Sequence, residues 1–391
     1  MTVRTKHSRI YLDHQATTPV DPRVIQAMQP YLADCFANPS ATTHVSGIKA
    51  RQAVENARKQ IALAIGAPTN DIIFTSGATE SNNLAILGTI EANKSKRNRV
   101  ITVSTEHKSV LETTKQLRSR GYEVISVGVG KDGIVNVNEL RKYIDSNTLL
   151  VSVMLVNNET GVIQPIKEIS EICNNDGALL HSDCAQALGK MPVNVISLDV
   201  NLASFSAHKV YGPKGIGALY IKQLKSALIR PITFGGGQER GLRPGTLPVN
   251  LCVGFGEAAK ISLLERNQDS EKSILLEQRL WNGILSVIPQ VKLNGHPNFR
   301  APGCMNIACK GISSDSLIDA WAELEIAKGS ACEATNTQSS HVLRAMGLSR
   351  SQADSSLRIG VGRFTNDKEI SRAISIIQSS FGFEGRKSGL V

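Results

Sequence analysis

The stretch LASFSAHKVYGPKGIGALYI, residues 202–221, indicates the kind of fold to which this chain belongs. It contains two short apolar runs, 202–205 and 216–221, on either side of a loop rich in glycine. Runs that are almost entirely apolar are typical of strands buried on both faces of a sheet. Lys209 lies in the loop that follows the first run. The stretch therefore predicts a buried sheet with a lysine close to the end of one strand.

Similar apolar runs occur along the first two thirds of the chain, and helical patterns separate many of them. We expect further strands at residues 72–74, 100–103, 123–129, 149–156 and 179–181. We expect helices that begin at Pro22 behind an Asp21 cap and at residues 48–65, 80–93, 109–120, 138–145 and 166–174. Apolar strands joined by helices indicate an α/β protein with a mostly parallel sheet that is covered by helices on both faces.

The pattern changes near residue 263. A long helical stretch occupies residues 263–288, and a strand is expected at 304–309. A last helix begins at Asn366, where Glu369 can complete a capping box. This part of the chain is typical of a smaller α+β unit.

The chain of 391 residues is longer than the ~250 to 300 residues that one hydrophobic core usually serves. We therefore expect two domains. The large α/β domain is predicted at residues 15–262, and the smaller domain is predicted to combine residues 1–14 with residues 263–391.

The composition, with 41% hydrophobic and 20% charged residues, is that of a folded chain. The densest apolar stretch, residues 149–156, is far shorter than the ~20 residues that span a membrane. The first ten residues, MTVRTKHSRI, lack the apolar core of a secretory signal. We therefore expect a cytoplasmic protein that does not associate with membranes.

The net charge of +10 favours anionic partners. The longest basic cluster, residues 94–99, has no aromatic residues on which bases could stack, so we interpret it as a solvated loop and expect no direct nucleic-acid binding. Seven cysteines form an odd set, which favours reduced thiols over a disulfide framework. Cys304 and Cys309 lack the second ligand pair of a zinc site, so no metal is expected.

Three polar motifs follow predicted strands, where open α/β sheets bind their ligands. Residues 74–83, FTSGATESNN, could form a phosphate cup at a helix N-terminus or simply cap that helix. Lys209, beside Ser206 and His208, could form a Schiff base or be a surface lysine in a turn. Asp183 could pair with a pyridinium nitrogen or cap the next helix. Together the three motifs are what pyridoxal phosphate requires.

The chain resembles the cysteine desulfurases, which are fold-type I pyridoxal-phosphate enzymes of the class V aminotransferase-like superfamily. The resemblance extends from Tyr11 to about Ile377. The matching motifs are YLDHQATTP (11–19), ANPSATTHVSG (37–47), FTSGATESNN (74–83), STEHKSV (104–110), VNNETGVIQPI (156–166), HSDCAQALGK (181–190), SAHKVYGPKGIG (206–217) and GGGQERGLRPGTLP (235–248).

The resemblance implies a role for each matched residue. Lys209 would carry the cofactor, Asp183 would hold the ring nitrogen, and Gln186 would bond the ring hydroxyl. His107 would stack on the ring and move protons. The remaining cofactor contacts would come from Ala78, Thr79, Asn158, Ser206 and His208, and from Thr246 of a neighbouring subunit, which implies a homodimer.

The resemblance also implies a nucleophile and a substrate anchor. Cys332 ends the Gly-Ser-Ala-Cys motif at residues 329–332 and would accept sulfur as a persulfide, which puts the catalytic cysteine loop in the smaller predicted domain. Arg358 would bind the substrate carboxylate with both ends of its guanidinium, and Asn158 would lie beside it. The sequence departs from its relatives in the residues EATNTQS that follow Cys332.

The implied reaction converts L-cysteine to L-alanine and delivers sulfur to an acceptor protein. That acceptor could serve iron–sulfur cluster assembly or the thiolation of tRNA or DNA. Alternatives are selenocysteine lysis, transamination, or a non-catalytic adaptor of a sulfur pathway. An intact set of Lys209, Asp183 and His107 argues against an adaptor, because only an enzyme needs it.

Overall fold

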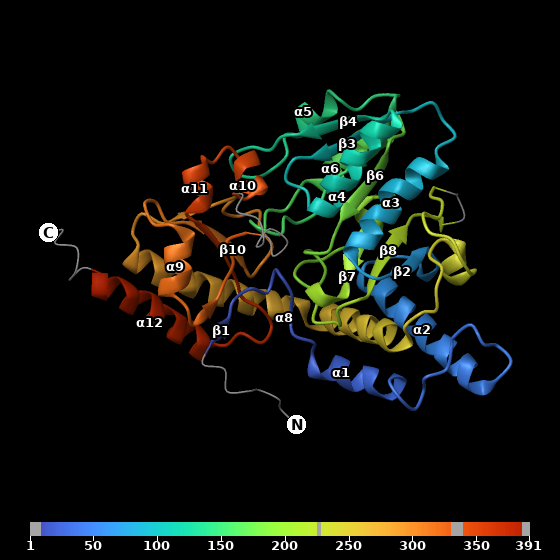
Figure 1. Cartoon of the computed structure of the whole chain (residues 1–391), viewed down its shortest axis with the longest axis horizontal. Helices are drawn as coiled ribbons and strands as arrows, with labels where there is room; N and C mark the ends of the chain where they lie inside the picture. Colours follow the sequence, from blue (N-terminus) through green and yellow to red (C-terminus); the bar gives the residue numbers. More distant parts are fainter. Residues whose placement is uncertain (1–8, 225–227, 330–338, 385–391) are drawn as a thin grey trace.

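The computed structural model describes residues 9–224, 228–329 and 339–384 (Figure 1). Within these ranges a seven-stranded sheet has the strand order β2-β8-β7-β6-β5-β3-β4. β8 is antiparallel to both of its neighbours, and the other strands all run in one direction. The bounds are β2 Ile72–Thr75, β3 Arg99–Val103, β4 Glu123–Val127, β5 Thr148–Ser152, β6 Leu179–Asp183, β7 Leu202–Ser206 and β8 Gly217–Ile221. The prediction of a mostly parallel α/β sheet is confirmed.

Helices cover both faces of this sheet, because neighbouring residues of each strand point to opposite faces. Ile72 and Phe74 of β2 belong to the main core cluster, which includes residues of α2 and α8. Ile73 lies between them in the chain and packs instead with Leu84 of α3. The helices of this part are α1 Pro22–Met28, α2 Val45–Ala64, α3 Ala78–Ala92, α4 Lys108–Leu117, α5 Val137–Arg141, α6 Ile166–Asp176 and α7 Val195–Leu198.

A second core lies beside the first one, at the left of Figure 1. It is built around a three-stranded antiparallel sheet of order β12-β10-β9 and includes the buried Trp321. The strands are β9 Lys292–Leu293, β10 Cys304–Ala308 and β12 Ser356–Gly360. The helices α9 Ser314–Ala320 and α12 Asp367–Glu384 pack on this core, whereas α10 His341–Ala345 and α11 Arg350–Asp354 form a small apolar cluster of their own. A short parallel pair, β1 Ile10–Tyr11 and β11 Leu324–Glu325, brings the N-terminal segment to this core.

The helix α8, Val249–Val287, contributes to both cores. The start of this helix was predicted near residue 263. This was wrong, because the helix begins at Val249, more than three helical turns earlier. Gly254 and Gly256 weaken the helical pattern there, but they let neighbouring elements approach closely. A Cβ at Gly256 would lie 2.5 Å from the Cα of Ala57 in α2. The predicted domain boundary between residues 262 and 263 falls within this helix and stays a prediction.

Other local predictions agree with the structure. Asp21 caps α1 by accepting a hydrogen bond from the Arg23 backbone N–H. Asn366 and Glu369 exchange the two hydrogen bonds of a capping box. The strand β12 was not predicted, because its residues SLRIG mix apolar and polar side chains and form too short a run.

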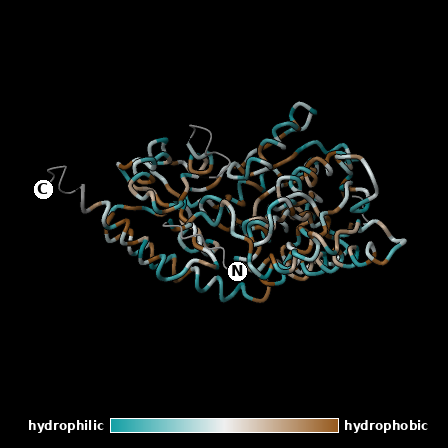
Figure 2. The backbone as a smooth tube through the Cα atoms, turned by 60° about the horizontal axis from the view of Figure 1, so that its bottom comes forward, coloured by the Kyte–Doolittle hydropathy of each residue, from teal (hydrophilic) through white to brown (hydrophobic). Residues whose placement is uncertain are grey.

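The distribution of hydropathy follows this architecture. In Figure 2, hydrophilic and hydrophobic stretches alternate along the long helices at the bottom of the molecule, as expected for helices with one buried face. Among the residues that the structure describes, no helix combines the length and the hydropathy that crossing a bilayer would require.

A buried ion pair connects α2 with the segment that precedes α8. Arg58 donates to both carboxylate oxygens of Glu239, each at 2.7 Å, and the two side chains are 5% and 2% exposed. Glu239 also accepts the backbone N–H of Phe74 in β2. Removing the charge of Glu239 leaves the buried Arg58 with only the half-exposed carboxylate of Glu55, at 3.2 Å, as an ionic partner, which compensates its burial poorly.

We therefore expect Glu239→Gln to lower the free energy of unfolding by about 3 to 5 kcal/mol, as measured by urea denaturation. The matched control is Glu91→Gln, which breaks the exposed pair with Arg120 and should cost less than about 1 kcal/mol. Equal effects of the two variants would contradict this prediction.

Candidate active site

A cleft of about 450 Å³ opens at the carboxyl ends of the parallel strands. It contains residues from β6 and β7, the start of α3, the segment before α4, and β12 of the second core. The predicted site residues that line it are Ala78, Thr79, His107, Asn158, Asp183, Gln186, Ser206, His208, Lys209 and Arg358. Parallel strands end at the same edge of a sheet, so residues far apart in the chain meet there.

One predicted site residue that the structure describes, Thr246, does not line this cleft. Thr246 is exposed, in the segment before α8. Cys332 lies outside the described residues, and so do residues 333–338 of the EATNTQS stretch that follows it, whereas the last residue of that stretch, Ser339, is described.

Lys209 ends a single 3₁₀ turn, Ala207–Lys209, that follows β7. Its Nζ donates hydrogen bonds to the backbone oxygens of Gln15 at 2.5 Å and Ala16 at 2.8 Å. Both acceptors are neutral backbone oxygens, and these bonds hold the amine at the cleft. An amine in this position can be reached by a carbonyl group bound in the cleft.

Asp183 is the last residue of β6 and is 6% exposed. Its Oδ1 accepts from the Ala185 backbone N–H at 2.9 Å, and its Oδ2 accepts from Nδ2 of Asn82 at 2.7 Å. Burial raises the pKa of the nearby Glu106 well above its usual value. The raised pKa favours the uncharged form of Glu106 and so limits the negative charge beside Asp183.

A chain of hydrogen bonds leads from Asp183 to His107. Nδ2 of Asn82, which donates to Asp183, also donates to Oγ of Ser109 at 2.8 Å. Nδ1 of His107 accepts from the Ser109 backbone N–H at 3.1 Å and lies 2.7 Å from the Ser109 hydroxyl. Because Nδ1 is an acceptor, the neutral ring carries its proton on Nε2. This chain fixes both the orientation and the tautomer of His107.

The N-terminus of α3 faces the cleft at Ala78 and Thr79. Its N-cap is Gly77, which has no side chain to occupy the first N–H groups, so they remain available to an anion. Burial and the charge of Lys209 lower the pKa of His208 to about 4, so His208 is neutral at pH 7. This end of the cleft can therefore bind a phosphate through hydrogen bonds, the helix dipole and nearby lysines.

Arg358 lines the cleft from β12 and is 1% exposed. Its Nη2 donates to Oδ1 of Asp13 at 2.7 Å, and its Nη1 donates to the backbone oxygen of Asn158 at 3.0 Å. Its buried Nε has no hydrogen-bond partner among the described residues. A buried donor without a partner is costly, so this edge of the guanidinium is suited to a ligand carboxylate.

Gln186 is held from both ends of its amide. Its Nε2 donates to the backbone oxygen of Gln15 at 2.9 Å, and its Oε1 accepts from Nζ of Lys190 at 2.5 Å. Burial lowers the pKa of Lys190 to about 8. The amide orientation is therefore set by its neighbours before any ligand binds.

Sequence reasoning missed several residues of this site. They are Asp13, Gln15, Asn82, Glu106 and Lys190. All five lie within motifs that the resemblance identified, which is the one signal that could have found them. Their roles depend on contacts with distant segments, so their own sequence neighbours do not indicate them.

The cleft thus combines an amine, a carboxylate, an anion-binding helix terminus and an arginine. Such a set can hold a phosphorylated, nitrogen-containing ring at three points and an amino acid carboxylate at a fourth. Small side chains such as Ala78 and Ala185 are among the residues that line the cleft.

Comparisons with known proteins agree with this chemistry. The family model described as Aminotransferase class-V matches residues 10–373. The cysteine desulfurase IscS of Rickettsia typhi is 47% identical over 370 residues, which are 95% of this chain and 90% of that protein. A NifS-like protein has a similar structure, with a TM-score of 0.89 and 34% identity over 96% of this chain and 100% of its own. The structure titled SspA in complex with cysteine has a TM-score of 0.81 and 36% identity, over 91% and 99% of the two chains.

The stability of the folded chain depends on pH through three histidines whose pKa is lowered by burial. Burial lowers the pKa of His14, His181 and His208 from 6.5 to about 4. The folded state therefore resists protonation that the unfolded chain accepts, so stability is fully present above pH 6.5 and declines as the pH falls toward 4. One such group can account for up to about 3 kcal/mol.

We expect the free energy of unfolding to decrease over this interval and the decrease to be smaller in His181→Gln, as measured by urea denaturation at each pH. In the structure His181 lies between the hydroxyls of Ser152 and Ser204. An unchanged slope in the variant would contradict the assignment of this effect to His181.

Proposed function

The chain belongs to the aminotransferase class-V family, and we propose that it is a cysteine desulfurase in which Lys209 carries pyridoxal phosphate and Cys332 accepts the sulfur. The observation that carries this proposal is the convergence of Lys209, Asp183 and Arg358 on one cleft beside the N-terminus of α3. The reaction converts L-cysteine to L-alanine.

The residues of the cleft fit the cofactor. The N-terminus of α3, with Ser206 and His208, would bind its phosphate, and Asp183 would accept a hydrogen bond from its protonated ring nitrogen. When bound, pyridoxal phosphate supplies an electron sink that allows the Cα proton of an amino acid to leave. Gln186 would bond the ring hydroxyl, with its amide already oriented by Lys190.

The substrate would be held by the second core. Arg358 presents its Nε edge to the cysteine carboxylate, while Asp13 and Asn158 hold its other nitrogens. Once released from the cofactor, the Lys209 amine would remove the Cα proton. His107 would assist proton movement through Nε2, since Nδ1 is engaged by Ser109. The relative SspA, whose structure contains cysteine, supports cysteine as the substrate here.

The sulfur would pass to Cys332 as a thiolate. Its attack forms an S–S bond and breaks the Cβ–S bond of the substrate, whose electron pair stays with the carbon that becomes the alanine methyl group. Burial raises the pKa of four of the other thiols, those of Cys173, Cys184, Cys304 and Cys309, which disfavours their thiolates. Burial likewise raises the pKa of Cys252.

The acceptor of this sulfur is proposed to be a protein of iron–sulfur cluster assembly or of tRNA or DNA thiolation. The relative IscS from Rickettsia typhi is named only for the desulfurase step, so its name does not select among these routes. The cytoplasmic location remains a prediction.

Replacing Lys209 and Cys332 should stop the reaction at different steps. Lys209→Ala should lose the absorbance band near ~420 nm and its response to cysteine, because the covalent link to the cofactor is gone. Cys332→Ser should keep the band and its response, yet form no alanine and no persulfide, because a hydroxyl is a poor nucleophile toward sulfur. Absorbance spectra, alanine assays and mass spectrometry check these outcomes.

A Cys332→Ser variant that makes alanine at nearly the wild-type rate would remove Cys332 from its role. Mass spectrometry that places the added sulfur on Cys184 would do the same. A wild-type protein without a cysteine-responsive band would contradict the proposed cofactor chemistry itself.

We also propose that two copies of the chain form a dimer in which Thr246 completes the partner's phosphate site. Thr246 is exposed and lies outside the cleft of its own chain. Large apolar side chains are exposed at Leu32, Phe36 and Phe234, with exposed fractions of 64%, 80% and 88%. Exposed apolar groups of this size are often covered in an assembly.

Mixed dimers test this arrangement. Lys209→Ala and Thr246→Glu should each be inactive alone, the second because its charge repels the phosphate. If Thr246 acts across the interface, a mixed dimer carries both lesions in one site and none in the other. Random mixing should then restore about one quarter of wild-type activity. Absence of restoration, or a fully active monomer in sedimentation, would contradict the proposal.

A further inference from the structure

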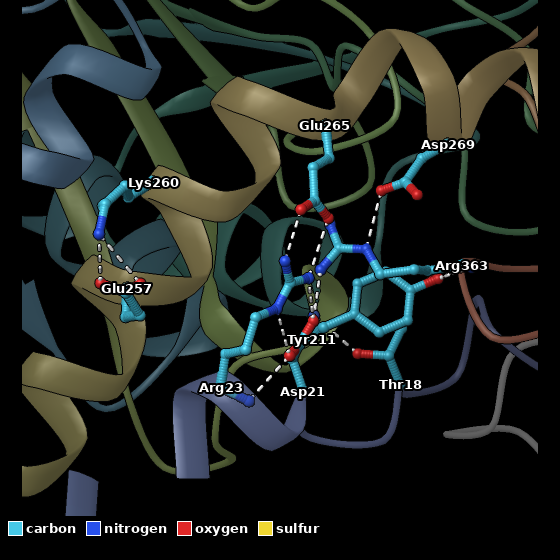
Figure 3. Close-up of polar contacts among 9 residues, drawn as sticks. All are labelled: Thr18, Asp21, Arg23, Tyr211, Glu257, Lys260, Glu265, Asp269 and Arg363. Atoms are coloured by element: carbon cyan, nitrogen blue, oxygen red, sulfur yellow. Dashed lines mark hydrogen bonds and ion pairs between the residues drawn. The ribbon is translucent and has the colours of Figure 1, made fainter. Parts of the chain in front are cut away.

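Tyr211 lies at a junction of four segments of the chain, shortly after Lys209. Figure 3 shows its ring beneath the guanidinium of Arg363, which extends between Asp21 and Asp269. The backbone of Tyr211 is left-handed, with φ 64°. This conformation is unfavourable for a residue with a bulky side chain and persists only where the surroundings enforce it. The contacts of Tyr211 show what enforces it.

The backbone of Tyr211 is bound to the segment before α1. Its N–H donates to Oγ1 of Thr18 at 2.8 Å, and its oxygen accepts the N–H of Asp21 at 2.9 Å. Thr18 in turn donates to the backbone oxygen of His208 through both its N–H and its hydroxyl, each at 3.0 Å. On the side of the Lys209 loop these bonds use only main-chain groups, those of Tyr211 and His208.

The side chain of Tyr211 is bound to a different part of the molecule. Its hydroxyl accepts the backbone N–H of Arg363 at 2.5 Å. The guanidinium carbon of Arg363 lies 4.5 Å from the centre of the ring, and Phe364 meets the ring edge-on at 5.4 Å. There is no spare room at this contact, because a Cβ added to Gly362 would collide with the Tyr211 hydroxyl.

Arg363, whose N–H donates to the Tyr211 hydroxyl, lies in the segment that follows β12, and β12 carries Arg358. The far end of this segment is anchored by charge. Arg363 donates to Asp21 at 3.0 Å and to Asp269 of α8 at 2.8 Å, and these side chains are largely buried. Arg23 joins the same cluster by bonding both Asp21 and Glu265 (Figure 3).

We propose that Tyr211 is a positioning residue whose backbone fixes the loop of Lys209 and whose hydroxyl fixes the strand of Arg358, so that it sets the distance between the amine and the carboxylate anchor. The two cores meet at the cleft, and Lys209 and Arg358 come one from each of them. Tyr211 is a direct connection between the segments that carry them. This inference rests on the proposed function of both residues.

The two roles of Tyr211 depend on different atoms of the residue. The bonds to Thr18 and Asp21 use main-chain atoms, so they survive replacement of the side chain. The bond to Arg363 uses the hydroxyl alone and is lost in Tyr211→Phe. Burial raises the pKa of Tyr211 to about 12, so the hydroxyl is neutral at any pH used for the assay.

The experiment compares wild-type holoenzyme with Tyr211→Phe, using L-alanine as a probe that has the carboxylate but no sulfur. We expect the variant to keep its cofactor band, because the Lys209 loop is held by main-chain atoms. The Kd for L-alanine, read from the absorbance change, should rise by about three- to tenfold, because one buried N–H of the Arg358 segment has lost its acceptor. The KM for cysteine should rise to a similar degree, while kcat changes by less than about twofold.

Two further variants accompany this one. Gly362→Ala keeps the hydroxyl but forces it away from the segment, so it should weaken L-alanine binding in the same direction. Tyr122→Phe removes a hydroxyl that accepts from Asn93 at 3.4 Å and does not line the cleft, so it should leave binding unchanged.

A Tyr211→Phe enzyme that binds L-alanine as tightly as the wild type overturns the inference, even when its thermal stability is reduced, because the role is then only structural. Loss of the cofactor band in Tyr211→Phe also overturns it, since the hydroxyl would then act on the Lys209 side. If the absorbance of the wild-type enzyme does not change with L-alanine or cysteine, the proposed function is contradicted instead. The two failures can be told apart, because this one is seen in the unsubstituted protein.

Discussion

The parallel pairing of β6 with β7 is the constraint on which the cleft depends. Its register places Asp183 opposite Ser204, so β6 ends beside the turn that carries Lys209. A shift of one residue would turn every side chain of a strand to the other face of the sheet, where the helices pack. Asp183 would then leave the cleft, so the apolar contacts that fix the register also position the charged groups.

Hydrogen bonds between side chains orient the groups that the sheet brings to the cleft. Asn82 belongs to α3, Ser109 to α4 and Asp183 to β6, yet the three side chains form one hydrogen-bonded chain that ends at His107. Each bond replaces a bond to water, so its net contribution to stability is modest. Its larger consequence is orientation, because a ring with one nitrogen engaged has one orientation and one tautomer. The site is therefore arranged before a ligand enters.

The second core contributes the arginine of the cleft, Arg358, which does not come from the seven-stranded sheet. Arg358 projects from an antiparallel strand whose position depends on β10, on the N-terminal segment and on the cluster around Arg363. The helix α8 belongs to both cores and so limits their relative movement. A buried arginine is costly unless its donors are satisfied, and Asp13 and Asn158 satisfy only part of them. This incomplete pairing is consistent with a site for a carboxylate.

The sequence alone determined the alternating strands and helices, the mostly parallel sheet, and the positions of Asp183 and Lys209 near strand ends, because periodicity and apolar runs are local properties of the chain. It also indicated Arg358 and Cys332, through motifs rather than through physical pattern. Tertiary structure decided the reversed direction of β8, the existence of β12, and the partners Gln15 and Asp13. Asp13 and Arg358 are 345 positions apart in the chain, and the residues next to each of them in the sequence do not indicate their contact. Only the folded chain brings those groups within hydrogen-bonding distance.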